Sequence, residues 1–163
     1  MDDELKLFVY GSLKPGECND EVISAWVLEA LPASIAGQMY LRPDGYPALW
    51  LEGTFALGTA DYEADLARCR QPVVGGGGGV QGQLLHLREG RTMLERLDQF
   101  EGYYPGQPSE YARLLVPVAT PAGVCAAWTY ACPEGGPRPR WVGIDCWPPP
   151  GSEKPAPYRV PPR

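Results

Sequence analysis

The stretch FVYGSLKPGE, residues 8–17, joins the end of a strand to a glycine turn. Residues 5–10 form a short apolar run stopped by Gly11, which predicts a buried strand. A strand that ends in such a turn exposes several backbone N–H groups in one direction. A nest of this kind binds a carboxylate or another small anion. A tight turn without a ligand explains the same residues, and both interpretations stay open.

Outward from this stretch, apolar periodicity predicts the other elements. We expect a helix from Asn19 or Asp20 to about Leu31, ended by Pro32, and helices at 61–70 and 92–101. Further strands are expected at 34–41, 46–50, 80–87, 111–119 and 124–131. Short strands joined mostly by turns predict an α+β domain with a largely antiparallel sheet or small barrel.

The 163 residues match one domain in length, and 44 % of them are hydrophobic. We expect this domain at 1–132, with a longer inserted segment at about 51–79. Five consecutive glycines at 75–79 predict a flexible linker or loop, because no Lys-Ser/Thr follows them as in a phosphate-binding loop. The proline-rich tail, 133–163, is expected to pack on the domain as an extended cover or to be partly disordered.

Charge and composition argue against several function classes. The net charge of −6 disfavours nucleic-acid binding, and no apolar stretch approaches the ~20 residues of a membrane span. The acidic N-terminus is unlike a signal peptide, so we expect a cytoplasmic protein. The five cysteines, an odd number without a CxxC pair, predict free thiols: Cys18, Cys69, Cys125, Cys132 and Cys146. No residues have metal-ligand spacing, so neither a metal nor a cofactor is expected, and the oligomeric state is not predicted.

Glu101 is the candidate for acid–base chemistry. Thr92 and Glu95 fit a capping box, which predicts a helix that begins at Thr92 and ends before Gly102. At about 100° per residue, Glu101 falls roughly 50° from the centre of the apolar face, whereas Asp98 falls roughly 110° away, at its rim. The apolar face itself consists of Met93, Leu94, Leu97 and Phe100.

An inward carboxyl at the end of a helix has a raised pKa for two reasons. Burial disfavours the charged form, and so does the negative end of the helix dipole. Such a carboxyl can both accept and donate a proton near neutral pH. The alternative is a structural glutamate bonded to backbone amides or to an arginine such as Arg113.

Other candidates carry weaker signals. Tyr111 and Arg113 are expected on one side of a strand, where the arginine pairs with Glu101, with a substrate carboxylate or with a surface group. Ser12 has no base except the distant His86, which argues against a serine-hydrolase triad. The remaining aromatic residues belong either to a pocket or to the core: Tyr103, Tyr104, Trp128 and Tyr130.

Taken together and in order, several segments resemble the gamma-glutamylcyclotransferase-like family, which includes the AIG2-like proteins. They are FVYGSLKPGE (8–17), AGQMY (36–40), GYPAL (45–49), VQGQL (80–84), LDQFEGY (97–103), YAR (111–113) and AWTY (127–130). The resemblance spans about residues 5–131. It implies a small mixed barrel with flanking helices and a cavity at one end.

The resemblance also implies a reaction on a small gamma-glutamyl amide, which releases 5-oxoproline and a free amine. Glu101 is then the general acid/base, and the backbone amides of Tyr10, Gly11, Ser12 and Leu13 hold the substrate's α-carboxylate. Tyr46, Tyr111 and Arg113, in the matching segments, are further expected substrate-binding residues. Two other classes remain: a non-catalytic module that binds a small carboxylate or peptide terminus, and a protein-interaction domain acting through the proline-rich tail. That tail, with Trp141 and Trp147, and the 51–79 segment depart from the family pattern and are candidates to cover the pocket.

Overall fold

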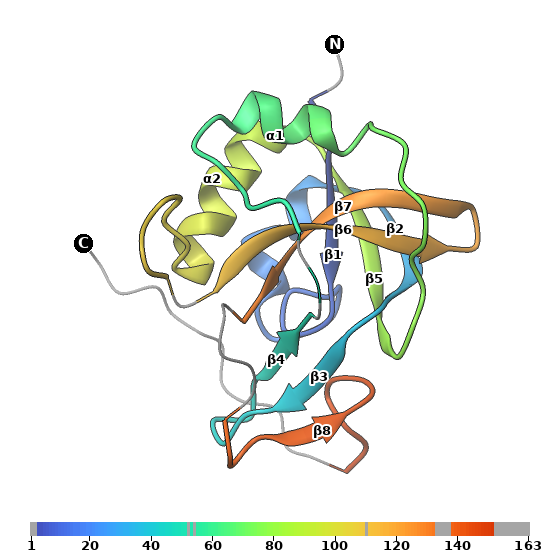
Figure 1. Cartoon of the computed structure of the whole chain (residues 1–163), viewed down its shortest axis with the longest axis vertical. Coiled ribbons are helices and arrows are strands. Elements are labelled where there is room, and N and C mark those ends of the chain that lie inside the picture. The colour runs from blue at the N-terminus through green and yellow to red at the C-terminus, as the bar shows by residue number, and fades with distance from the viewer. Residues whose placement is uncertain (1–2, 52, 54, 110, 133–137, 152–163) are drawn as a thin grey trace.

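A closed five-stranded barrel forms the centre of the computed structural model, which describes residues 3–51, 53, 55–109, 111–132 and 138–151. Its strands, in barrel order, are β1 (Leu5–Val9), β5 (Val80–Leu87), β2 (Val27–Ile35), β6 (Ala112–Thr120) and β7 (Gly123–Ala131). Neighbouring strands run antiparallel, except that β1 and β7 close the barrel in parallel (Figure 1). The expected small, mixed and largely antiparallel barrel is confirmed.

A separate antiparallel sheet lies beyond one end of the barrel, with the strand order β4 (Pro47–Trp50), β3 (Gln38–Leu41) and β8 (Val142–Ile144) (Figure 1). Strand β8 comes from the proline-rich tail and occupies an edge, where few backbone N–H groups need a partner. The remaining parts of that tail, 133–137 and 152–163, lie outside the described residues.

Two helices, α1 (Tyr62–Arg68) and α2 (Gly90–Glu101), pack together against the barrel (Figure 1). Helix α1 begins as expected, because the Asp61 side chain accepts a 3.1 Å hydrogen bond from the Ala64 N–H. Helix α2 ends as expected at Gly102, whose φ of 70° is left-handed.

The expected start of α2 at Thr92 is wrong. The helix begins two residues earlier, at Gly90, and no side chain caps it. Gly90 donates a 2.7 Å hydrogen bond to the Asp3 carbonyl, and a Cβ on Gly90 would come within 2.2 Å of that oxygen. Contact with the N-terminal segment therefore fixes the start of the helix, in place of the capping box.

The expected helix from residue 19 or 20 to 31 is also wrong. Two short 3₁₀ helices, η1 (Asp20–Val22) and η2 (Ser24–Trp26), lead directly into β2. Residues 29–35 pair in order with residues 86–80 of β5, so long-range backbone hydrogen bonds override a local helical pattern. The expected strand at 34–41 is divided between β2 and β3 for the same reason.

The core consists of two clusters on opposite faces of the barrel strands. Alternation along β1 sends Leu5, Leu7 and Val9 to one cluster, and Phe8 and Tyr10 to the other. The first cluster includes the inner face of α2, made by Met93, Leu94, Leu97 and Phe100. The second includes Met39 and Leu49 of the small sheet and Trp147 of the tail. Both clusters adjoin the end of β1, where the site lies.

Candidate active site

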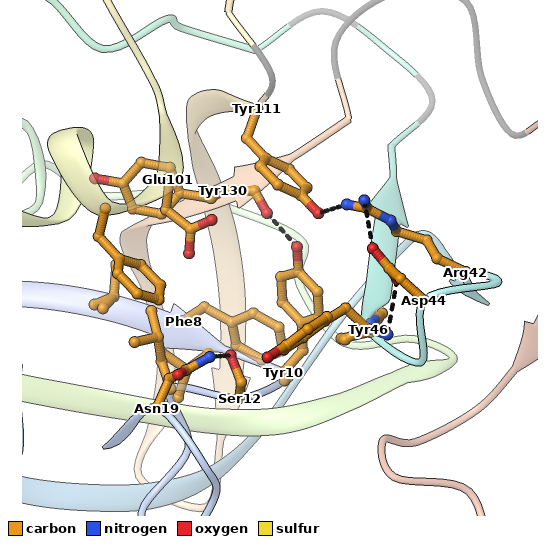
Figure 2. Close-up of a pocket in the computed structure, with 16 residues that line it drawn as sticks. Phe8, Tyr10, Ser12, Asn19, Arg42, Asp44, Tyr46, Glu101, Tyr111 and Tyr130 are labelled. Carbon is orange, nitrogen blue, oxygen red and sulfur yellow. Dashed lines mark hydrogen bonds and ion pairs between the residues drawn. The ribbon is translucent and has the colours of Figure 1, made fainter. Parts of the chain in front are cut away.

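A pocket of about 150 Å³ opens where the loop after β1, the β3–β4 turn and the end of α2 meet (Figure 2). This space suits a roughly benzene-sized group, such as a short acyl chain. Residues from all three elements line it. Most of the residues that the sequence predicts for the site are among them: Tyr10, Gly11, Ser12, Leu13, Tyr46, Glu101 and Tyr111.

The loop at residues 10–13 is held from both sides. The Lys14 N–H donates to the Gly11 carbonyl at 3.0 Å, and Asn19 donates to Ser12 twice, at 2.9 Å to its carbonyl and at 2.8 Å to Oγ. Gly11 has no room for a side chain, because a Cβ would lie 2.6 Å from Cγ of Pro47. Within the described residues, the backbone N–H groups of Ser12 and Leu13 have no acceptor. The loop is thus a rigid wall with two available donors.

Glu101, the last residue of α2, is half-buried, and its side chain points into the pocket toward Tyr10 (Figure 2). Burial raises the pKa of Tyr10, Tyr111 and Tyr130, and the nearby Glu101 carboxylate raises each of them further. These phenols therefore keep their protons at neutral pH. The carboxylate faces neutral hydroxyl groups of the pocket wall.

The tyrosine hydroxyls and the β3–β4 turn complete the wall. Tyr10 donates to the Tyr130 carbonyl at 2.5 Å, and the Tyr111 hydroxyl accepts from Arg42. Arg42 also forms an ion pair with Asp44, whose carboxylate lies 2.7 Å from the guanidinium. The Asp44 side chain is 46 % exposed. The turn thus presents a charged pair at the pocket mouth (Figure 2).

Arg113 is not part of the pocket, which corrects its expected place beside the substrate. It is fully buried behind α2, where its guanidinium donates to Asp98 at 2.8 and 3.1 Å and to Asp65 at 2.9 Å. Burial acts to lower the pKa of Arg113, but the hydrogen bonds that it donates to the carboxylates outweigh this effect and raise that pKa overall. Tyr111 precedes β6 and Arg113 lies within it, so the two side chains do not share a strand face as expected.

The expected position of Asp98 at the rim of the apolar face of α2 is wrong, because Asp98 is buried and only 2 % exposed. It accepts from Arg113 and, at 2.6 Å, from the Tyr130 hydroxyl. Helical periodicity counts apolar residues only and misses a buried carboxylate with a buried cation as its partner. Asp98 therefore forms the buried ion pair with Arg113 that the sequence offered for Glu101.

Tyr130, which the sequence left open between pocket and core, lines the pocket. Sequence reasoning missed several other pocket residues: Phe8, Asn19, Arg42, Asp44, Pro47 and Phe100. The signal for two of them was present, since Arg42 and Asp44 flank Pro43 in a turn that follows a strand. A turn explains Pro43 and Gly45 but not an arginine at its start. The other residues carry no local mark, because alternation and long-range pairing bring them to the pocket.

Two further features are absent from the part of the chain that the structure describes. No group of three or more His, Cys, Asp or Glu side chains there is arranged to hold a metal ion. No helix in that part of the chain is both long and apolar enough to cross a membrane.

Known proteins share this fold and parts of this sequence. The gamma-L-glutamyl-butirosin B gamma-glutamyl cyclotransferase of Niallia circulans is 29 % identical over 126 residues, which cover 76 % of this chain and 64 % of that relative. The chain thus spans less than two thirds of the relative's length. Solved structures with the same fold include an AIG2-like protein from Mus musculus, with 22 % identity, a TM-score of 0.53 and coverage of 82 % of this chain and 80 % of that one. Another is YkqA from Bacillus subtilis, with 19 % identity, a TM-score of 0.53 and coverage of 86 % and 38 %.

The family model described as gamma-glutamyl cyclotransferase, AIG2-like, matches residues 7–148. This range includes the barrel apart from the first two residues of β1, together with α2 and the pocket residues that the sequence predicts. The chain belongs to the gamma-glutamyl cyclotransferase, AIG2-like family.

Proposed function

We propose that this protein converts a gamma-glutamyl amide into 5-oxoproline and a free amine, with Glu101 as the general acid/base. The observation that carries the proposal is the presence of Glu101 and the 10–13 loop in one small pocket. Glu101 provides a carboxylate, and the 10–13 loop provides backbone N–H donors. Those are the two kinds of group that the reaction needs.

The reaction balances within the substrate and one carboxyl group. Glu101 takes a proton from the α-ammonium group, and the freed amine attacks the γ-carbonyl carbon to close a five-membered lactam. The bond from that carbon to the leaving nitrogen breaks as Glu101 gives its proton to that nitrogen. The ring nitrogen then loses its second proton to Glu101, which leaves a neutral lactam, and Glu101 passes this proton to the released amine, which departs as an ammonium ion. Because nucleophile and carbonyl are already tethered, correct orientation supplies much of the rate, and proton transfer supplies a further ~10²–10⁴-fold.

The available N–H groups of Ser12 and Leu13 support binding of the substrate's α-carboxylate at the 10–13 loop. Anchored there, the glutamyl chain would fold toward Glu101 within a space that suits a short acyl group. The leaving amine would then extend through the mouth, past Arg42 and Asp44. Butirosin B, the amine in the name of the Niallia circulans relative, is one candidate for this leaving group.

The test is 5-oxoproline release from gamma-glutamyl amino acids, gamma-glutamyl amines, glutathione and a gamma-glutamyl aminoglycoside. Glu101→Gln removes the proton carrier and keeps the size of the side chain, so we expect kcat to fall by about 10²-fold or more. Glu95→Gln is the matched control, because Glu95 lies on the same helix but is exposed, and it should retain wild-type turnover. Full activity of Glu101→Gln on a substrate that the wild type cleaves would overturn the mechanism.

A wild type that binds gamma-glutamyl amides in a calorimeter but releases no 5-oxoproline would overturn the proposed reaction. That outcome would favour a module that holds a small carboxylate in the same pocket.

A further inference from the structure

The C-terminal segment reaches the pocket from outside the barrel. Strand β8 pairs with β3 through Val142, Gly143 and Ile144, which carries the chain along the small sheet. Three residues later Trp147 enters the second core cluster, where it is 1 % exposed. The Trp147 side chain is therefore buried in the core behind the residues that line the pocket.

Trp147 contacts both elements that form the pocket mouth. Its Nε1–H donates to the Gly45 carbonyl at 2.8 Å, and its ring stacks on that of Tyr46 with centroids 6.4 Å apart and planes 10° apart. Its own carbonyl accepts a 2.5 Å hydrogen bond from Lys14 Nζ, next to the 10–13 loop. One tryptophan thus joins the β3–β4 turn to the loop after β1.

Tyr46 is the pocket residue that depends on this contact. Burial raises its pKa, and a hydrogen bond with Asn19 partly offsets that effect. The ring is therefore held by Trp147 and reaches across to the residue that supports Ser12. Beside it, Pro47 lies against Gly11. A shift of the turn would move Tyr46 and Pro47 together, which changes the shape of the substrate site but leaves Glu101 on α2 in place.

We propose that Trp147 is a positioning residue, which holds Tyr46 and the 42–47 turn against the 10–13 loop and thereby sets substrate affinity. The proposal rests on the proposed function of the pocket. It assigns Trp147, from the proline-rich tail, to the functional unit, although the sequence predicts a domain that ends at residue 132. Glu101 and its proton transfer lie on a different element and do not depend on this contact.

The test compares four variants by kcat and KM for 5-oxoproline release and by thermal unfolding. For Trp147→Ala we expect KM to rise by about tenfold, equal to ~1.4 kcal/mol, with kcat changed by less than about twofold. Trp147→Phe keeps a ring on Tyr46 and should restore most of the affinity. Lys14→Met removes the link to the Trp147 carbonyl without opening the core, so its KM should rise even if Trp147→Ala fails to fold.

Trp141→Ala is the matched control. It removes the same side chain from the same segment, outside the pocket lining, and should leave KM unchanged. A purely structural role for Trp147 would reduce the amount of active enzyme, so that kcat falls while KM stays constant in Trp147→Ala and Lys14→Met. That result would overturn the proposal.

Calorimetric titration with the same gamma-glutamyl amides separates this proposal from the proposed function. If the wild type binds without turnover, the reaction is wrong, and the ratio of Kd values between Trp147→Ala and wild type decides the role of Trp147. A wild type that neither binds nor cleaves any of them overturns both.

Discussion

Arg113 illustrates how a single buried charge is stabilised in this protein. Two carboxylates, the Thr59 carbonyl at 3.0 Å and the ring of Trp128 at 4.7 Å surround its guanidinium. Gly58 covers it closely, since a Cβ there would lie 2.4 Å from the guanidinium carbon. Asp98, one turn before Glu101, is held by this cluster, so the catalytic candidate sits on a firmly anchored helix end.

Arg113→Met should lower the free energy of unfolding by about 3–5 kcal/mol, because it leaves two buried carboxylates without their cation. Urea unfolding followed by circular dichroism measures this change. Arg91→Met is the control: Arg91 forms a 3.4 Å pair with Glu63 at 66 % and 77 % exposure, and exposed pairs contribute about 0–1 kcal/mol. Equal effects of the two variants would contradict a structural role for the Arg113 cluster.

At the scale of elements, the five-glycine run packs against strands. Gly76 and Gly77 lie next to Ala119 of β6, and Gly78 lies next to the chain just after β2. The run crosses the seam of the barrel at which β2 and β6 share a single registered pair, Ser34 with Ala119. The expected loop at 75–79 therefore covers a join between barrel strands that has little registered pairing of its own.

Gly78→Ala should destabilise the fold by about 1–3 kcal/mol, because the added Cβ would lie 2.7 Å from Cα of Ala36, where the backbone cannot easily move. Gly79→Ala is the matched control, since a Cβ there meets nothing within 4 Å and its φ is not left-handed. Thermal unfolding of the two variants measures the difference. A Gly78→Ala melting temperature equal to that of Gly79→Ala would show that the contact across the seam is not needed.

At the scale of the whole molecule, the two core clusters share every barrel strand. Leu85 and Leu87 of β5 belong to the cluster under α2, whereas Val80 and Leu84 of the same strand belong to the cluster with the small sheet. A strand that loses its contacts with one cluster also loses the position that its contacts with the other cluster require. The barrel, the helices and the small sheet are therefore expected to unfold together.

Leu94→Ala in the first cluster and Ile35→Ala in the second should each cost about 2–5 kcal/mol, and each should shift the entire unfolding transition. Near-ultraviolet and far-ultraviolet circular dichroism should give coincident curves for both variants. Leu28→Ala, at a position 59 % exposed, should change stability by about 0.5 kcal/mol or less. Separate transitions for the two probes would show instead that the small sheet unfolds as an independent unit.

The sequence by itself determined the α+β class, most strands and the residues of the 10–13 loop, because alternation, glycine turns and apolar runs are local properties of the chain. The choice of a barrel over an open sheet came from the resemblance to the family. It also indicated that Glu101 faces inward at the end of a helix. Strand β5 at Val80–Leu87 and the end of α2 at Gly102 agree with prediction for this reason.

Only the tertiary structure decided where long-range partners override local patterns. Pairing with β5 turned residues 27–35 into a strand, and contact with Asp3 set the start of α2. The pairing of Asp98 with Arg113 and the contacts of Trp147 with Tyr46 and Lys14 join residues far apart in the chain. Buried ion pairs and contacts between distant segments depend on partners that no local pattern specifies. Their interaction energy arises only when folding removes both groups from water.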